Sequence, residues 1–401
     1  MIVLAVNCGS SSVKCRVFDV TNDHKPVAVR VLAEGSVGGV PEEPVMVLRT
    51  EAGALRQAIA VDDNAGGVRR LLQELTGALG LSRIEAVGHR IVHGGTRFTR
   101  SVLIDASVLK TLEELEELAP LHNRASLAGV RAARALLGWR VPMVGAFDTA
   151  FHAFLPDRAW RYAIPENLVQ RHGVRRFGFH GLSYQWTLWR FGELTGTRPE
   201  QARIVALHLG NGCSAAAIEG GRSVDTSMGF TPLEGLVMGT RAGDIDPALV
   251  GHLSRMEGVG INTVEDWLNT RSGLLGLSGL SPDMQTLLAR EADHAGARLA
   301  IEVFCYRARK YVGAYLAALG GAQAVVFTGG IGANSPEIRR RICDGLQWFG
   351  LRIDPALNRR AAGVDGRISA DAAPIAGYAI SPDEEQIIAR ETVQVCEGGG
   401  E

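Results

Sequence analysis

The sequence predicts an α/β protein built from two related halves that flank a cleft. Runs of β-branched residues alternate with helical patterns along the 401 residues, which is typical of a sheet covered by helices. A strand–turn–strand unit at the start of the chain recurs about two hundred residues later, and such repetition indicates a duplicated fold. The 49 glycines supply turns in which backbone can approach a ligand closely.

The first hairpin opens the chain. Ile2–Val6 is apolar throughout and predicts a buried strand. Residues 7–12 read Asn-Cys-Gly-Ser-Ser-Ser, a polar turn. Apolar and polar positions then alternate over Val13–Val20, which predicts a second strand with a lysine, Lys14, at its start.

The second hairpin has the same plan. Ile204–Leu209 predicts a strand, residues 210–214 a Gly-rich turn, and Ala215–Glu219 a returning strand. The other predicted elements are a helix over Ser107–Ala119 capped by Asp105 or Ser107, a helix over Asp293–Leu319, a strand over Ala324–Phe327, a helix from Pro336 and a final helix over Asp383–Thr392.

Composition narrows the function classes. The chain is 46% hydrophobic and 21% charged with a net charge of −1, which does not favour a nucleic-acid or membrane partner. Its six cysteines form no Cys-x-x-Cys pair, which indicates reduced thiols in a cytoplasmic protein. We expect neither a signal peptide in the short apolar start nor a membrane-spanning helix.

Phosphate is the ligand that the turns favour. Neither Gly-x4-Gly-Lys-[Ser/Thr] nor Gly-x-Gly-x-x-Gly occurs. Instead, three Gly-rich turns, residues 7–12, 210–214 and 329–334, each follow a predicted strand. Each alone could simply reverse the chain, but backbone N–H groups in three such turns favour nucleotide binding.

Two further stretches place charge among small residues. His89 and His93 lie four residues apart, but the pattern is that of a strand and no third ligand is evident, so a metal role is disfavoured. Arg241 lies among small residues beside Asp244 and Asp246. It is either a pre-oriented cation or part of an internal salt bridge.

These residues resemble the acetate kinase family. The matching motifs run through the whole chain in the family's order: Asn7-x-Gly-Ser-Ser-Ser-x-Lys14, His89-Arg90-x-Val92-His93-Gly-Gly, Asp148-Thr-Ala-Phe-His152, Gly178-Phe-His180-Gly181, residues 208–217, 223–247, 276–284 and 328–335, and Asp383-Glu384-Glu385. The resemblance implies a duplicated actin-like ATPase fold, a cytoplasmic homodimer, ATP or ADP as co-substrate, and Mg2+, for which Mn2+ substitutes. It implies phosphoryl exchange between ATP and acetate, giving acetyl phosphate, with residues 1–149 plus 386–401 on the substrate side and residues 150–385 on the nucleotide side.

The resemblance also implies a role for each matching position. The catalytic residues are Arg90, Asp148, His180 and Arg241, and the substrate contacts are Arg90, Val92, Leu121, His122, Phe179 and Pro232. The nucleotide contacts are Ser10, Ser12, Lys14, His208, Leu209, Gly210, Asn211, Gly212, Asp283, Met284, Gln285, Gly330, Ile331, Gly332, Ala333 and Asn334, and the metal ligands are Asn7 and Glu384.

Asp148 has two candidate roles. A carboxylate nucleophile is ionised at pH 7 and needs no proton removed, as the glutamate pKa of roughly 4.3 shows. We therefore favour Asp148 as a positioner of Mg2+ or its water over a general base.

The chain departs from the family's pattern at several positions: Arg124 for a proline, Leu182 and Tyr184 for a threonine and a histidine, Gln285 for an arginine and Ala333 for a glutamate. We expect none to touch the phosphoryl-transfer centre, and the last two to bear on nucleotide affinity or base preference.

Three rival functions stay open from the sequence. The nearest is the same reaction on propionate or butyrate, because one methylene is worth only about 1–3 kcal/mol of discrimination. A non-catalytic ATP-binding scaffold is disfavoured because Lys14, Arg90 and Arg241 are all present. A sugar kinase is disfavoured because the implied pocket is too apolar.

Overall fold

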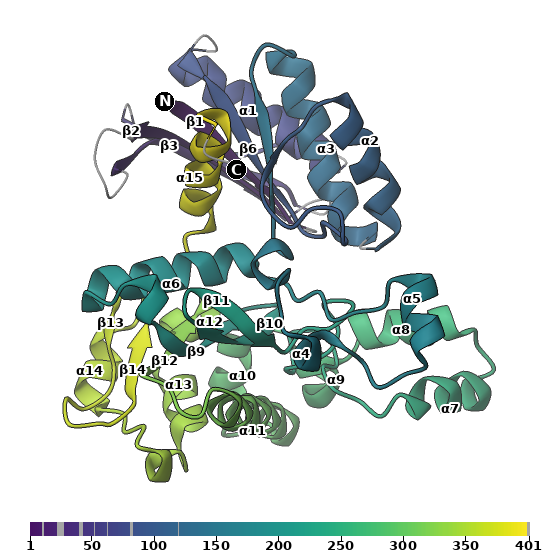
Figure 1. Cartoon of the computed structure of the whole chain (residues 1–401), viewed down its shortest axis with the longest axis vertical. Coiled ribbons are helices and arrows are strands. Elements are labelled where there is room, and N and C mark those ends of the chain that lie inside the picture. Colours follow the sequence, from purple (N-terminus) through teal and green to yellow (C-terminus); the bar gives the residue numbers. More distant parts are fainter. Residues whose placement is uncertain are drawn as a thin grey trace. The chain divides into compact units, whose positions relative to one another are not determined.

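A computed structural model describes residues 1–9, 12–21, 28–39, 43–51, 53–61, 63–80, 83–118 and 120–398, and for residues 28, 64, 79, 117, 118 and 120–122 the backbone only. The chain divides into two compact units, Met1–Ala153 with Asp383–Glu401, and Phe154–Pro382. Figure 1 shows the elements of each unit. The substrate-side and nucleotide-side domains expected from the sequence stay a prediction.

The first unit contains an eight-stranded sheet in the order β5-β4-β3-β2-β1-β6-β8-β7. Its strands are β1 (Ile2–Cys8), β2 (Ser12–Thr21), β3 (Ala28–Gly38), β4 (Val45–Thr50), β5 (Gly53–Ala58), β6 (Ala86–Ile91), β7 (Val102–Leu103) and β8 (Met143–Phe147).

The second unit contains a six-stranded sheet in the order β11-β10-β9-β12-β14-β13. Its strands are β9 (Arg203–Leu209), β10 (Cys213–Glu219), β11 (Arg222–Thr226), β12 (Ala324–Thr328), β13 (Gly366–Arg367) and β14 (Ala376–Ala379).

The two sheets share one plan, which confirms the duplicated fold. In the first, β1 is antiparallel to β2 and parallel to β6, and β6 is parallel to β8. In the second, β9 is antiparallel to β10 and parallel to β12, and β12 is parallel to β14. The short edge strand β7 is antiparallel to β8, and the short edge strand β13 is antiparallel to β14. Each half therefore brings a hairpin turn next to the carboxyl ends of parallel strands, where α/β proteins bind ligands.

Helices cover both faces of the first sheet. They are α1 (Asn64–Leu79), α2 (Ala106–Glu114), η2 (Leu115–Leu118), α3 (Pro120–Leu137), η3 (Ala150–His152) and α15 (Glu384–Cys396). Helices α1 and α3 lie on one face and α15 on the other (Figure 1). At Gly88 an added Cβ would lie 2.2 Å from Thr392 Oγ1 of α15, so glycine permits the close packing of the C-terminal helix.

In the second unit α6 and α11 pack against β9 and lie on opposite faces of the sheet (Figure 1). The helices are α4 (Asp157–Trp160), α5 (Glu166–His172), α6 (Gly181–Thr195), η4 (Pro199–Gln201), α7 (Ala248–Glu257), α8 (Ile261–Thr270), α9 (Gly273–Ser278), α10 (Met284–Arg290), α11 (Ala295–Ala318), α12 (Gly329–Asn334), α13 (Pro336–Cys343), η5 (Gln347–Phe349) and α14 (Pro355–Arg360). No helix in the described part of the chain is long and apolar enough to span a membrane.

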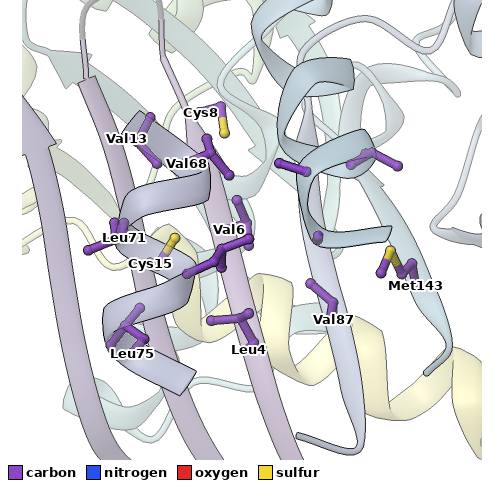
Figure 2. Close-up of a cluster of buried hydrophobic side chains, with 14 of the residues drawn as sticks. Leu4, Val6, Cys8, Val13, Cys15, Val68, Leu71, Leu75, Val87 and Met143 are labelled. Carbon is purple, nitrogen blue, oxygen red and sulfur yellow. The ribbon is translucent and has the colours of Figure 1, made fainter. Parts of the chain in front are cut away.

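The core of the first unit follows from the two periodicities of its sequence. Leu4, Val6 and Cys8 alternate along β1 and point to one face of the sheet. On α1, Leu71 and Leu75 lie four residues apart on the facing side (Figure 2). Burying one leucine side chain contributes roughly 1.5–3 kcal/mol to the stability of the fold. This layer therefore holds the first hairpin against the helices.

Two predicted elements differ in the structure. The helix predicted over Ser107–Ala119 ends at Glu114 and tightens into η2, and Asp105 rather than Ser107 caps it by accepting from Val108 N at 2.8 Å. The turn predicted at residues 329–334 is the short helix α12. Its glycines disfavour a helix locally, but Gly329 supplies a positive φ of 79° with which the helix can follow β12 directly.

Candidate active site

His180 holds a strained position at the start of α6 in the second unit. Its φ of 58° makes it the one non-glycine residue with positive φ among the described residues. Such strain persists where the surroundings over-determine the backbone, often at active sites. The chain turn here presents the imidazole at the N-terminal end of a 15-residue helix, where the helix dipole favours anions.

A pair of stacked imidazoles follows from this geometry. The rings of His180 and His208 stack with centroids 4.1 Å apart. His180 Nδ1 is 2.8 Å from Ser214 Oγ, and His208 Nδ1 is 2.7 Å from Ser183 Oγ. A serine hydroxyl therefore contacts Nδ1 of each ring.

Arg241 and His180 converge on Gly212. A Cβ added at Gly212 would lie 2.8 Å from Arg241 Nη2 and 3.4 Å from His180 Nε2. A side chain here would therefore fill the space in front of both nitrogen atoms, which glycine does not occupy.

Arg241 is a cation without a counter-ion in the described part of the chain. Its Nη1 donates to the carbonyl oxygen of Pro232 at 2.7 Å, and burial lowers the pKa of the guanidinium. The neighbouring Asp244 accepts instead from Tyr311 and from Gly235 N. The internal salt bridge considered from the sequence is thus not found among the described residues, and a half-buried guanidinium that lacks a carboxylate is suited to an anionic ligand.

A pocket of 690 Å³ lies beside this cluster in the second unit. Its lining residues are Gly210, Asn211, Pro282, Asp283, Met284, Gln285, Leu288, Gly330, Ile331, Asn334, Ser335, Pro336 and Glu337. A ligand of the size of a nucleoside phosphate fits this volume. Eight of these residues are nucleotide contacts implied by the resemblance, and Pro282, Leu288, Ser335, Pro336 and Glu337 are additions from the structure.

Two departures from the family's pattern, Gln285 and Ala333, are expected to affect nucleotide binding, and they lie in different places. Gln285 lines the pocket and is exposed. Ala333 is 1% exposed and is not among the lining residues. Gln285 is therefore the departure that a bound nucleotide would meet.

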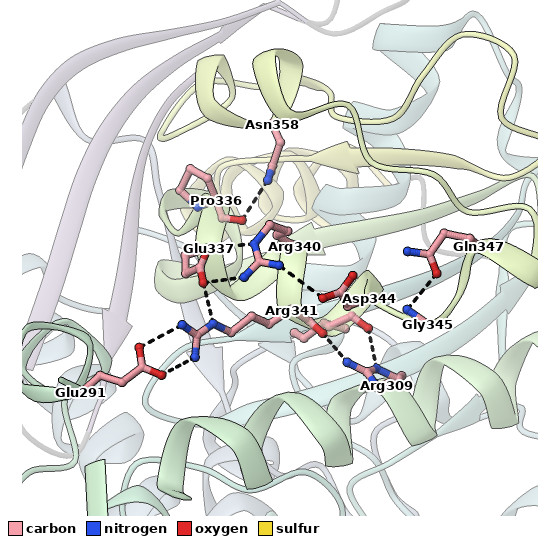
Figure 3. A network of polar contacts seen from close by, with 11 residues as sticks. Glu291, Arg309, Pro336, Glu337, Arg340, Arg341, Asp344, Gly345, Gln347 and Asn358 are labelled. Carbon is pink, nitrogen blue, oxygen red and sulfur yellow. Dashed lines mark hydrogen bonds and ion pairs between the residues drawn. The ribbon is translucent and has the colours of Figure 1, made fainter. Parts of the chain in front are cut away.

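Glu337 joins the pocket to an arginine network on α13 (Figure 3). It accepts from Arg340 Nη2 at 2.8 Å and from Arg341 Nε at 2.6 Å. Arg341 is in turn paired in a bidentate manner with Glu291. The hydrogen bonds from Arg340 and Arg341 lower the pKa of Glu337 to about 2, so this pocket wall stays anionic at neutral pH.

We expect Glu337→Gln to destabilise the protein above pH 4.5 and to have less effect as the pH falls toward 2. The folded-state pKa lies below the unfolded one, so the stabilising contribution is present above the unfolded pKa and is lost on acidification. The effect is modest because the side chain is 40% exposed. Urea unfolding across this pH range, with the exposed Glu302→Gln as control, measures it. A destabilisation that stays constant with pH contradicts the prediction.

Arg90 and Asp148 form a partly buried ion pair in the first unit. Arg90 lies on β6, and Asp148 follows the parallel neighbour β8. Asp148 Oδ2 accepts from Arg90 Nη2 at 2.6 Å and from Nε at 3.1 Å, and Asp148 is 1% exposed. Burial lowers the pKa of Arg90, but Asp148 and Glu384 outweigh it and raise the pKa above its ordinary value. Asp148 therefore orients Arg90, a role that the sequence did not suggest.

Asn7 links this pair to two adjacent carboxylates. Its Oδ1 accepts from Arg90 Nη1 at 3.1 Å, and its Nδ2 donates to Glu384 Oε2 at 3.2 Å and to Glu385 Oε1 at 3.1 Å. Burial and the charge of Glu384 raise the pKa of Glu385. Helix α15 thus brings two carboxylates from the end of the chain to the first hairpin, where Lys14 lies opposite Asn7.

The remaining predicted contacts are partly described. Val92 and Phe179 are buried, and Pro232 is half-buried. Ser12 starts β2, and its backbone oxygen accepts from Gly9 N at 2.8 Å. Leu209 and Gly332 lie next to the pocket-lining residues Gly210 and Ile331 without lining the pocket. Ser10 and the side chains of Leu121 and His122 lie outside the described residues.

One departure from the family's pattern lies close to His180. Tyr184 OH is 2.5 Å from Ser214 Oγ, which itself contacts His180 Nδ1. Ser214 thus lies between Tyr184 and His180. The expectation that no departure touches the phosphoryl-transfer centre stays a prediction. The four-residue spacing of His180 and Tyr184 predicts that they share one face of a helix. Ser214 lies on β10, and nothing in its local sequence predicts the contact with either residue.

The fold and these two clusters define a phosphotransferase of the duplicated actin-like ATPase fold. A sequence model of the acetokinase family matches residues 2–390, so the chain belongs to the acetokinase family. Relatives include the acetate kinases of Chloroherpeton thalassium, 46% identical over 98% of both chains, and Solibacter usitatus, 47% identical over 99% of both.

Two solved structures are similar over the whole chain. The acetate kinase of Porphyromonas gingivalis matches with a TM-score of 0.88 and 37% identity, covering 98% of this chain and 99% of that one. A propionate kinase from Francisella tularensis matches with a TM-score of 0.89, 36% identity and the same coverage. The resemblance seen in the motifs is confirmed, while the individual site residues stay predictions.

Proposed function

We propose that the chain catalyses reversible, Mg-dependent transfer of the γ-phosphoryl group of ATP to acetate, giving acetyl phosphate and ADP. The observation that carries this proposal is the convergence of Arg241 and His180 on Gly212. Such donors stabilise the charge that develops on a transferring phosphoryl group. Relatives named acetate kinase at 46% and 47% identity support acetate as the acceptor.

The reaction is a direct in-line displacement. Arg90, oriented by Asp148 and Asn7, binds the acetate carboxylate. One carboxylate oxygen forms a bond to the γ-phosphorus while the bond to the β-phosphate oxygen breaks and ADP leaves. His180 and Arg241 stabilise the equatorial oxygens, and no proton needs to be moved because acetate is already ionised.

The carboxylates on α15 fit a magnesium ion. Mg2+ prefers oxygen ligands and keeps several waters, so it needs few protein ligands. Glu384 with Asn7 would hold it, and Mn2+ would substitute. Glu384 and Glu385 both accept from Asn7 Nδ2, and a bound cation would relieve the repulsion between two such neighbouring carboxylates. When bound, the ion supplies positive charge at the phosphates.

A hydroxamate assay for acyl phosphate tests the proposal. With Mg-ATP we expect acetate to give product faster than propionate, and propionate faster than butyrate. Propionate is the second candidate because the similar Francisella tularensis structure is a propionate kinase. If none of the three acids gives product above the blank, the result favours a non-catalytic ATP-binding protein.

We expect Val92→Ala to lower the KM for propionate relative to acetate. Val92 is 4% exposed and follows Arg90 by two residues at the end of β6, so truncation opens space near the proposed carboxylate site. One methylene is worth about 1–3 kcal/mol in such a pocket. An unchanged ratio of kcat/KM for the two acids would show that Val92 does not border the methyl group.

We also propose a cytoplasmic homodimer. Leu249, Met256 and Ile261 on α7 and α8 are exposed apolar side chains, which support a protein interface. All six cysteines are free, which supports a reducing compartment. Sedimentation of the purified chain measures the oligomeric state, and a monomer would contradict the proposal.

A further inference from the structure

The carbonyl of Pro232 restricts where the Arg241 guanidinium can lie. Arg241 donates from Nη1 to this carbonyl oxygen at 2.7 Å, and a Cβ added at Gly212 would lie 2.8 Å from Nη2. A guanidinium is planar and rigid, so the contact of one nitrogen limits the position of the other. Whatever holds the Pro232 carbonyl therefore also holds the nitrogen that faces Gly212.

The hydroxyl of Tyr162 closes the loop on both sides of Pro232. It accepts from Phe230 N at 2.8 Å and donates to Glu234 Oε2 at 2.5 Å. Phe230 and Glu234 lie two residues before and two residues after Pro232. One phenol oxygen thus joins the ends of the segment Phe230–Glu234, which has the acceptor of Arg241 at its centre.

Neighbouring contacts support the closed loop. Arg176 donates from Nη2 to Glu234 Oε1 at 2.6 Å, and from Nη1 to the carbonyl oxygens of two residues that precede the loop. A Cβ added at Gly229 would lie 1.8 Å from Glu234 Oε2 and 2.1 Å from Tyr162 OH, so a glycine is needed where these two side chains meet. The contacts of Arg176 do not involve the Tyr162 hydroxyl, so we expect the loop to loosen without unfolding when that hydroxyl is removed.

We propose that Tyr162 is a positioning residue that holds the Pro232 carbonyl where it orients Arg241 toward the transferring phosphoryl group. Tyr162 forms no hydrogen bond with Arg241 in the described part of the chain, so its effect passes through the loop. The catalytic consequence rests on the proposed function, whereas the placement of Arg241 does not.

Tyr162→Phe should lower kcat about 3- to 10-fold, the range expected for the loss of one neutral hydrogen bond. The KM for ATP should stay near wild type, because the residues that line the proposed nucleotide pocket do not include Tyr162 or its loop. Tyr378→Phe is the matched control, since it removes a hydroxyl in the same unit from a ring that packs against Phe191. The control should keep wild-type kcat, and thermal unfolding of both variants checks that the fold is kept.

A double variant separates positioning from a merely structural role. If Tyr162 acts through Arg241, Tyr162→Phe should lower kcat by less than about twofold once Arg241→Lys is already present. If Tyr162 only stabilised the unit, the two losses would multiply.

Crystal structures of the wild-type protein and Tyr162→Phe measure the placement of Arg241 directly. In the variant we expect the Phe230–Glu234 segment to shift and the contact between Arg241 Nη1 and the Pro232 oxygen to lengthen beyond hydrogen-bond distance. Glu234→Gln weakens the same closure by removing the charge that Tyr162 and Arg176 contact. It should produce the same shift, and it provides the test if Tyr162→Phe does not fold.

An unchanged contact between Arg241 and Pro232 in these variants would overturn the proposal, as would kinetic losses that multiply in the double variant. If the wild-type chain transferred no phosphoryl group to any acid, the proposed function would fail, and the crystal structures would still decide whether Tyr162 places Arg241.

Discussion

Arg241→Lys is expected to lower kcat about 10²- to 10³-fold while the protein stays folded. Arg241 donates to the Pro232 carbonyl through Nη1 and presents Nη2 toward Gly212. A lysine cannot make both contacts, because its ammonium is a single point charge on a flexible stem. Loss of one such donor from a transition state typically costs on the order of 2.7–4 kcal/mol.

The measurement is kcat in the acetyl phosphate assay together with thermal unfolding. Arg190→Lys is the matched control, since Arg190 pairs with Asp365 in the same unit and away from Gly212. The control should keep near wild-type kcat. A kcat for Arg241→Lys within about twofold of wild type would remove Arg241 from the phosphoryl-transfer centre.

The backbone of the site could be predicted from local sequence because each part carries its own signal. The strands Ile2–Val6 and Ile204–Leu209 are marked by apolar, β-branched runs, and both are confirmed within β1 and β9. The Gly-rich turn after β9 supplies Gly210 and Asn211 to the pocket. Turn chemistry and period-two patterning are local, so one sequence suffices to read them.

Contacts between distant elements could not be predicted in the same way. The Arg90–Asp148 pair joins residues 58 positions apart, and Asn7 meets Glu385 across 378 positions. Neither partner is unusual in its local sequence. The two contacts that join Tyr184 to His180 could not be predicted for the same reason, because they pass through Ser214, a residue on another element. Side-chain networks depend on the packing of the whole unit, which periodicity does not encode.

Asp148→Asn is expected to lower kcat/KM for acetate about 10²-fold, mainly by releasing Arg90. The carboxylate accepts from both Nε and Nη2 of Arg90. An asparagine offers one acceptor oxygen and turns an NH2 group toward the guanidinium. Arg90 would then keep Asn7 at 3.1 Å and Glu384 at 3.8 Å, and a misplacement of about 1 Å can cost 10²-fold in rate.

Three measurements separate the possible roles of Asp148. Release of Arg90 should raise the KM for acetate and leave the KM for ATP near wild type. A role in positioning Mg2+ or its water, favoured from the sequence, should instead raise the Mg2+ concentration for half-maximal rate, with partial rescue by Mn2+. A general base should remove the acidic limb of the kcat/KM–pH profile. Asp365→Asn, which breaks the Arg190–Asp365 pair outside the site, should change none of these. An unchanged acetate KM in Asp148→Asn, together with a shifted metal dependence, would show that Asp148 acts on the metal and that its contact with Arg90 is structural.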